Sequence, residues 1–362
     1  MLKSLFPEYV KKWFAPLVKK VAETINGSAE KPKYLFKAML RETFSPDLKW
    51  GSLSSNGSVV AADIVSMNSS LPLKKRDSMG KATGDIPKSG MKLVLTEKQL
   101  SDIDIMKAKG GKEAEVVRKI FADVKRVIGG VEERIEYMFL TGLSNGVLVV
   151  PSEDTAGTGI RADFGHPDSQ KFGVKKKWLE DPSTVLDDIE NVISKAEAKG
   201  RTLAYIFLDG ATFNVIRKSA QVRSLYSADL QISDPANVPI PSKKKVRELI
   251  LDEYGLTIQI IDRTVMLEKN GKRNPVKPWA AGSVAFLTSL DAGELQYGTL
   301  AEENHPVEGV SYTKANSYTL VSKYHKNDPV REFTSSQALV IPVIDVDNLF
   351  LMDTNEAQEV DG

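Results

Sequence analysis

The sequence predicts a mixed α+β protein that folds into more than one lobe. Its 362 residues exceed what a single compact core usually holds. Three patterns support this fold class: two strands joined by a long polar stretch between residues 59 and 95, one apolar stripe at helical spacing between residues 113 and 140, and alternating helices and strands over residues 171–300. We therefore expect a separate α/β lobe and a lobe organised around one long helix.

The composition excludes several classes of protein. Apolar residues make up 41% of the chain and charged residues 27%, which is ordinary for a folded soluble protein and excludes wholesale disorder. The net charge of +1 gives no global field of the kind that marks a dedicated nucleic-acid binder. The chain has no cysteine, which excludes disulfides, thiolate zinc sites and cysteine nucleophiles. No apolar run approaches the roughly 20 residues of a membrane span, and lysines interrupt any signal-like start, so we expect a cytoplasmic product without a membrane partner.

The two ends of the chain carry opposite charge. In residues 1–49, basic side chains outnumber acidic ones. In residues 343–362, all the charged side chains are acidic. Two interpretations remain open: solvated termini, or arms that contact surfaces of opposite charge on neighbouring subunits. Apolar residues at three- and four-residue spacing predict short helices between Leu2 and Val21. Trp13 and Phe14 in this segment need cover from the chain's own core or from a partner, so both are candidate subunit contacts.

The polar stretch is the second candidate contact region. Residues 43–58 are typical of a loop, residues 59–65 and 91–95 of strands, and residues 66–90 show no apolar period. Long structureless loops in compact domains are usually functional, and this one is expected to lie on a neighbour. Its basic cluster, Lys74, Lys75 and Arg76, is the candidate contact with acidic groups of that neighbour.

The long helix is predicted from Glu113 to Leu140, preceded by a capping box at Thr96–Gln99. Gly129 and Gly130 lie inside it, and because glycine disfavours helix, we expect a bend or break there. Further along, Asp181 and Pro182 begin another helix, and strands are predicted at residues 146–150, 203–208, 256–261, 318–324 and 330–343.

No motif supports an enzyme. Residues 157–162 match a dinucleotide-binding pattern by letters but lack the helix that should follow. His166, His305 and His325 have no metal-ligand spacing. The lysine runs at 175–177 and 243–245 are more typical of a solvated surface than of a nucleic-acid site. We therefore expect no catalytic residue, no metal site and no cofactor.

Three stretches taken in order resemble the major capsid protein of tailed bacteriophages, with the Hong Kong 97-type fold, and within it the lambda-type major capsid protein E family. They are Val131-Glu132-Glu133-Arg134-Ile135-Glu136-Tyr137-Met138-Phe139-Leu140-Thr141-Gly142, then Ala280-Ala281-Gly282-Ser283-Val284-Ala285-Phe286, and Tyr324-His325-Lys326-Asn327-Asp328-Pro329-Val330-Arg331-Glu332 running on to Pro342. The resemblance covers residues 55–345.

The resemblance implies a domain organisation: an N-terminal arm (1–50), an extended loop (51–108), a peripheral domain with a spine helix (109–170), an α/β axial domain (171–309), return strands of the peripheral domain (310–345) and an acidic C-terminal tail (346–362). It also implies a non-enzymatic protein that assembles with itself, as pentamers and hexamers, into the icosahedral head of a tailed phage. The implied partners are portal, scaffold and decoration proteins and packaged double-stranded DNA, with assembly in the host cytoplasm and a final location in the virion. An encapsulin-like non-viral shell protein and an α/β enzyme with an unrecognised site are the alternatives.

Overall fold

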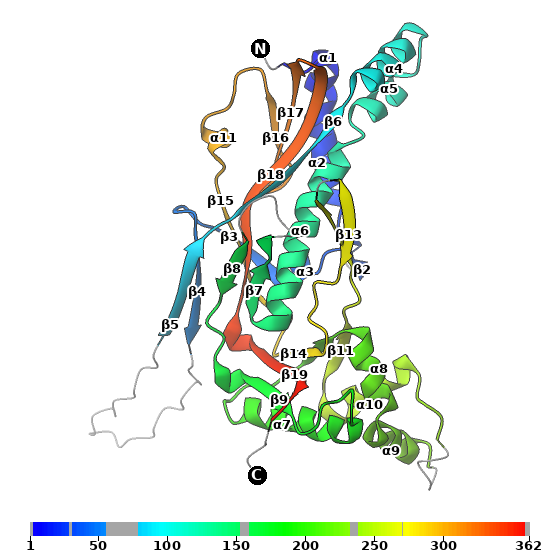
Figure 1. The fold of residues 1–362 in the computed structure, drawn as a ribbon, viewed down its shortest axis with the longest axis vertical. Coiled ribbons are helices and arrows are strands. Elements are labelled where there is room, and N and C mark those ends of the chain that lie inside the picture. Colours follow the sequence, from blue (N-terminus) through cyan, green and yellow to red (C-terminus); the bar gives the residue numbers. More distant parts are fainter. Residues whose placement is uncertain are drawn as a thin grey trace, which may run out of the picture. The chain divides into compact units, whose positions relative to one another are not determined.

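The computed structural model describes residues 3–28, 31–55, 79–152, 159–231, 238–269 and 271–358. The chain divides into two compact units (Figure 1). Unit 1 comprises residues 1–50, 84–138 and 293–343, and unit 2 comprises residues 51–83, 139–292 and 344–362. Each unit is therefore assembled from segments that are far apart in the sequence.

Unit 1 is built on a sheet whose strands come from both ends of the chain. Its order is β16-β17-β18-β15-β3, and β6 also pairs with β18. The strands are β3 (Leu40–Phe44), β6 (Lys88–Leu95), β15 (Gly293–Gly298), β16 (Ser311–Lys314), β17 (Leu320–Asn327) and β18 (Val330–Ile344). The predicted terminal strands are thus confirmed as an antiparallel pair, β17 and β18, whereas β3 and β15 pair in parallel.

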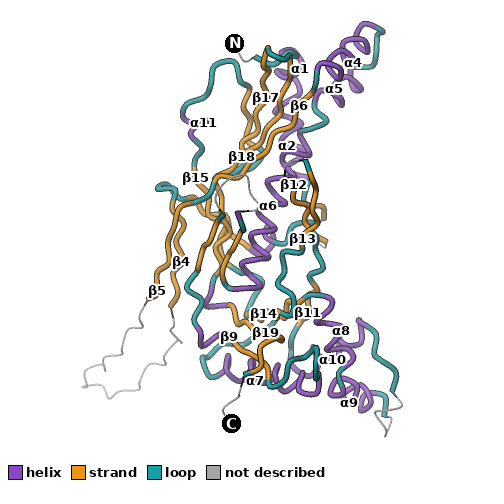
Figure 2. Tube along the Cα trace, viewed as in Figure 1, coloured by secondary structure: helices purple, strands orange, loops and turns teal. Residues whose placement is uncertain are grey.

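The two faces of β18 differ in burial, as the two-residue period of a strand requires. Glu332, Thr334 and Ser336 are buried, whereas the residues between them are partly exposed. Helices of unit 1 cover the buried face: Ser336 Oγ donates to the carbonyl of Val127 at 2.6 Å. Figure 2 shows the strands of this unit in orange and its helices in purple.

The helices of unit 1 come from the N-terminal segment, from residues 97–138 and, for one short helix, from residues 301–304. They are α1 (Pro7–Tyr9), a π-helix (Val10–Phe14), α2 (Ala15–Thr24), α3 (Phe36–Met39), α4 (Glu97–Ala108), α5 (Glu113–Ile120), α6 (Val124–Asn145, whose residues from 139 belong to unit 2) and the short α11 (Ala301–Asn304). A two-stranded pairing of β1 (Gly27–Ser28) with β2 (Lys31–Pro32) separates α2 from α3. The predicted capping box is confirmed, since the Thr96 N–H donates to Gln99 Oε1 at 2.9 Å.

The expected break at Gly129 and Gly130 is wrong. The helix is interrupted earlier, at residues 121–123 between α5 and α6, and α6 continues through both glycines. A neighbouring strand explains the glycine at position 130: a Cβ there would lie 2.0 Å from the Met91 Sδ of β6. The glycine therefore allows close packing rather than a bend.

Residues 49–55 correct a second expectation, because they form a strand where a loop was expected. This strand, β4 (Lys49–Ser55), pairs with β5 (Met79–Asp85) in a two-stranded sheet that no other described strand joins. The strand predicted at 59–65 and the cluster Lys74, Lys75 and Arg76 lie outside the described residues.

Unit 2 contains a five-stranded mixed sheet with the order β11-β10-β14-β19-β9. Its strands are β9 (Lys171–Val174), β10 (Tyr205–Leu208), β11 (Thr257–Ile260), β14 (Ser283–Leu287) and β19 (Leu349–Ala357). Four helices pack in the same unit: α7 (Val185–Glu197), α8 (Gly210–Lys218), α9 (Ala220–Asp229) and α10 (Lys243–Tyr254). Two hairpins complete it, β7 (Val147–Val150) with β8 (Ile160–Asp163) and β12 (Val265–Lys269) with β13 (Lys272–Val276).

The strand β19 corrects the expected acidic tail over residues 346–362. Its first five residues pair antiparallel with β14, from Leu349 opposite Leu287 to Asp353 opposite Ser283. Phe350 and Met352 are buried in the core of unit 2. The acidic residues conceal this strand in the sequence, because only its first half carries the apolar side chains that face the core.

Candidate assembly interface

The acidic residues of the long helix hold the N-terminal segment against unit 1. Glu136 on α6 is fully buried and accepts the backbone N–H groups of Leu35 and Phe36 at 3.0 and 3.1 Å. These N–H groups lie at the start of α3, where a helix has no internal acceptors for them. A carboxylate from a distant helix therefore caps α3.

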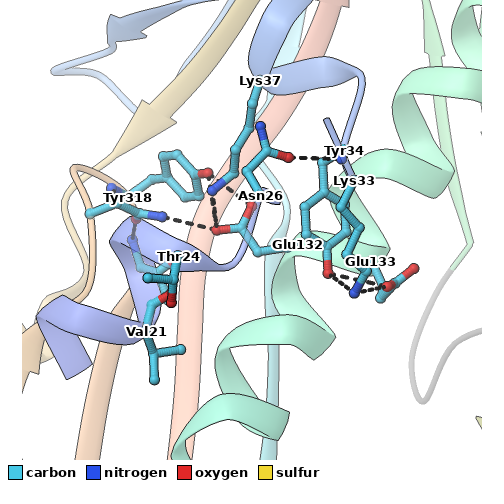
Figure 3. Close-up of polar contacts among 11 residues, drawn as sticks. Val21, Thr24, Asn26, Lys33, Tyr34, Lys37, Glu132, Glu133 and Tyr318 are labelled. Carbon is cyan, nitrogen blue, oxygen red and sulfur yellow. Dashed lines mark hydrogen bonds and ion pairs between the residues drawn. The ribbon is translucent and has the colours of Figure 1, made fainter. Parts of the chain in front are cut away.

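Glu132, one turn earlier on α6, joins two segments of unit 1 (Figure 3). Its carboxylate lies 2.9 Å from Lys37 Nζ and accepts hydrogen bonds from Asn316 at 3.1 Å and from the Tyr318 hydroxyl at 3.2 Å. Burial raises the pKa of Glu132, opposed by the Lys37 ammonium. The same burial, with the Glu132 charge, raises the pKa of Tyr318.

Glu133 supplies a third attachment on the same helix. Lys33 Nζ lies 2.9 Å from its carboxylate, and the Tyr34 hydroxyl donates to it at 3.1 Å (Figure 3). The Tyr34 N–H donates to Asn26 Oδ1 at 2.8 Å, which fixes the turn before α3. Three carboxylates within five residues of α6 thus bind the segment 33–37.

A buried ion pair anchors the start of the chain. Lys323 on β17 and Glu332 on β18 have no exposed side-chain surface, and Lys323 Nζ lies 3.7 Å from Glu332 Oε1. Glu332 also accepts hydrogen bonds from Ser4 Oγ and, at 3.0 Å, from the Leu5 N–H. Lys323 Nζ donates to the Ile120 carbonyl at 3.1 Å, and burial lowers the Lys323 pKa.

The two aromatic candidates for a subunit contact, Trp13 and Phe14, differ in burial. Phe14 is 2% exposed and stacks on Phe121 at 6.2 Å between ring centroids, so the chain's own core covers it. Trp13 is half-buried, and its indole N–H donates to Glu113 at 3.2 Å. Of the two, Trp13 retains the surface that a subunit contact requires. Lys74, Lys75 and Arg76 fall on residues that the structure does not describe.

The two lysine runs in unit 2 are largely neutralised within the chain. Lys175, Lys176 and Lys177 lie 3.7, 2.7 and 4.0 Å from Asp187, Asp181 and Glu180. Lys244 and Lys245 likewise pair with Glu248 and Asp229. This arrangement agrees with a solvated surface rather than a nucleic-acid site.

The histidines and carboxylates form no candidate metal centre in the part of the chain that the structure describes. His166 is buried, and its Nε2 lies 2.8 Å from the Leu349 carbonyl. Among the described helices, none combines the length and the apolar character that crossing a bilayer requires.

The sequence reasoning did not identify the buried carboxylates. Glu132 and Glu136 lie within the stretch that carries the family resemblance, where they were interpreted only as part of an amphipathic helix. Their spacing of four residues, next to the apolar positions Val131 and Ile135, places both on one helix face beside the core and could have indicated burial.

The fold is that of a capsid subunit. It is similar to the crystal structure described as a prophage capsid protein of E. coli CFT073, with a TM-score of 0.54, 12% identity, and coverage of 94% of this chain and 98% of that chain. It also resembles a subunit of the cyanophage A-1(L) capsid, with a TM-score of 0.47, 11% identity, and coverage of 92% and 96%. The predicted α+β, Hong Kong 97-type capsid fold is confirmed.

The family model of phage major capsid protein E matches residues 18–347, and the chain belongs to this family. A comparison with curated protein sequences finds no match. The protein is therefore a phage major capsid protein, a structural component of the virion shell and not an enzyme. The family favours this over the encapsulin-like shell and the α/β enzyme that the sequence left as alternatives.

Proposed function

We propose that this major capsid protein assembles with itself, as pentamers and hexamers, into the icosahedral head of a tailed phage that encloses double-stranded DNA. Assembly takes place in the host cytoplasm, with portal, scaffold and decoration proteins as partners. Membership of the family supports a shell built from this protein. The pentamers and hexamers, the partner proteins and the enclosed DNA are the further content of this proposal.

The observation that carries the self-assembly proposal is the two-stranded sheet β4–β5. Its strands pair with each other over Lys49–Ser55 and Met79–Asp85 and with no other described strand. An isolated two-stranded hairpin is marginally stable in water. A hairpin of this kind is stabilised when it lies on the surface of a neighbouring subunit, where it buries area that its own chain does not cover.

The proposed domain organisation follows the resemblance. Residues 1–50 form the arm, 51–108 the extended loop, 109–170 and 310–345 the peripheral domain, and 171–309 the axial domain. The division into unit 1 and unit 2 supports two lobes that each have their own sheet, with residues 139–170 in unit 2 and residues 293–309 in unit 1. Trp13, Lys74, Lys75 and Arg76 are proposed to contact neighbouring subunits, and Phe14 to support Trp13 from the core.

The experiment that tests self-assembly removes the connection of the hairpin. In the variant, a short Gly-Ser turn joins Ser55 to Met79, so that β4 and β5 keep their pairing. We expect a folded chain with a wild-type circular dichroism spectrum, because the deletion removes no described element. We expect no shells by electron microscopy when the protein is expressed with its phage partners.

A matched control shortens a different connection, the one between α9 and α10, by joining Gln231 to Val238 through the same turn. Normal heads from the variant that lacks residues 56–78 would contradict the role of the extended loop that the hairpin carries. A wild-type chain that stays monomeric at micromolar concentration with its partners present would contradict self-assembly itself.

A further inference from the structure

We infer that the exposed side of the N-terminal helices, of α5 and of the start of α6 in unit 1 binds the phosphates of duplex DNA inside the head. This inference rests on the proposed function, because it assigns the DNA contact of the shell to particular residues. We call this surface the basic helix face. It is defined by eight exposed basic residues: Lys11, Lys12, Lys19, Lys20, Arg118, Lys119, Lys125 and Arg126.

These residues belong to two helical segments on the same side of the unit 1 sheet. Glu332 and Ser336 project from the buried side of β18, where Glu332 binds the N–H of Leu5 and Ser336 binds the carbonyl of Val127. The stacked rings of Phe14 and Phe121 join the two segments. Within the segments, the Ile120 carbonyl accepts a hydrogen bond from Lys323 of the sheet, and Phe14, Ile120 and Phe121 are buried, whereas the basic side chains are exposed.

The charge of this surface contrasts with that of the chain. Residues 10–24 and 113–126 together contain eight basic and four acidic side chains, a net charge of +4 in a protein whose total is +1. One of the four acids, Asp123, is buried. The balanced total therefore conceals a local positive field.

Most of these cations have no acidic partner within the described part of the chain. Lys12 lies 2.8 Å from Glu113, and Arg126 lies 3.7 Å from Asp123. The other six form no ion pair with any described residue: Lys11, Lys19, Lys20, Arg118, Lys119 and Lys125. The lysines at 175–177 in unit 2 each have one. The basic helix face is thus left available for an external anion.

The chemistry of the surface favours duplex DNA as that anion. Flexible lysine and arginine side chains bind backbone phosphates without reading bases, which suits a shell that holds a genome of any sequence. Single-stranded nucleic acid is usually bound with aromatic side chains that stack on the bases. Of the aromatic residues here, Phe14 is buried against Phe121, and Trp13 is half-buried with its indole N–H bound to Glu113.

The test neutralises four unpaired cations with the variant Lys19→Gln, Lys20→Gln, Lys119→Gln and Lys125→Gln. All four are exposed and make no ion pair with a described residue, so the chain should fold normally. Binding of the unassembled full chain to a short mixed-sequence duplex is measured at several salt concentrations. The slope of log K against log salt should become shallower by about 0.9 for each phosphate that the variant no longer neutralises.

The matched control makes the same charge change on exposed lysines of unit 2: Lys218→Gln, Lys243→Gln, Lys272→Gln and Lys277→Gln. We expect its slope to stay near that of wild type. An unchanged slope in the test variant, or an equal change in the control, would overturn the inference. A test variant that binds DNA normally but no longer assembles with its scaffold would also overturn the inference. That result would show that the basic helix face binds an acidic protein rather than DNA.

Particle analysis separates this inference from the proposed function. Wild-type heads that protect DNA from nuclease, together with a variant that binds DNA as wild type does, would reject only the basic helix face. Wild-type shells that never contain DNA would reject the proposed function as well.

Discussion

At the scale of single residues, unit 1 contains ionisable side chains in its interior. Lys323 and Glu332 are fully buried, and the Lys323 ammonium also binds a backbone carbonyl. Replacing one partner of such a pair typically costs about 3–5 kcal/mol, because the other charge stays buried without compensation. The polar anchors therefore specify where Ser4 and Leu5 attach, more than they add net stability.

His166 in unit 2 makes the stability of the subunit dependent on pH. Burial lowers its pKa from 6.5 to about 4, so the folded chain keeps the ring neutral while the unfolded chain protonates it near 6.5. The free energy of unfolding is not reduced by His166 above its unfolded pKa. It falls by about 3 kcal/mol in total as the pH drops from 6.5 towards 4, because only the unfolded chain protonates this histidine in that range.

The measurement is urea unfolding of the unassembled protein across this pH range, compared with His166→Gln. Glutamine can still donate to the Leu349 carbonyl but does not titrate. We expect the free energy of unfolding of wild type to fall more steeply with acid than that of the variant. Parallel pH profiles for the two proteins would contradict this assignment.

At the scale of secondary structure, β6 approaches the long helix α6 closely at Gly130. The nearest atom to a Cβ built on Gly130 is Met91 Sδ at 2.0 Å, whereas the nearest to one on Gly129 is Ile25 Cδ1 at 3.8 Å. Both glycines have helical backbone angles, so substitution by alanine causes no backbone strain at either position. Adjacent residues of one helix therefore provide a matched pair.

We expect Gly129→Ala to stabilise the subunit by about 0.5–1 kcal/mol, because alanine has the higher helix propensity and the site has space. We expect Gly130→Ala to gain less than Gly129→Ala, because the Met91 side chain must move to admit the new Cβ. Thermal unfolding of the two variants beside wild type measures both effects. Equal stabilisation by both substitutions would show that Met91 does not restrict position 130.

At the scale of the whole molecule, each unit has its own sheet and core, and the hairpin β4–β5 has a sheet of its own. Forming a covalent bond between subunits from a loop lysine would require a neutral lysine in a desolvated site beside a carboxylate. Lys88, at the start of β6, is instead half-exposed and forms an ion pair with Glu302 at 3.0 Å. The structure at this lysine favours a shell held by non-covalent contacts.

Mature particles boiled in detergent and reductant should therefore give a single band near 39.8 kDa on a denaturing gel. Reductant makes no difference to this protein, because the chain contains no cysteine. A ladder of covalent multimers would contradict non-covalent assembly, and mass spectrometry of its cross-linked peptides would identify the lysine responsible.

The local patterns of the sequence determined most secondary structure. The capping box at Thr96 and the strands β10, β17 and β18 were predictable, because periodicity and capping residues act over a few neighbouring positions. The cap at Asp181 was predicted as well, but it begins a short 3-10 helix, Pro182–Thr184, that leads into α7 at Val185. The order of three stretches was enough to indicate the family, which the match over residues 18–347 confirms.

Tertiary contacts decided the rest. The glycines at 129 and 130 disfavour a helix locally, yet α6 continues through both, and Met91 of β6 lies where a side chain at position 130 would be. Leu349–Ala357 was expected to belong to an acidic tail, but pairing with β14, more than 60 residues earlier, makes it a strand. Glu132, Glu136 and Glu332 look like surface carboxylates in the sequence, because their partners at residues 4–37 and 316–323 are distant along the chain. The local spacing places Glu132 and Glu136 beside the apolar face of the helix, but it does not identify their partners, because pairing depends on which segments meet in space.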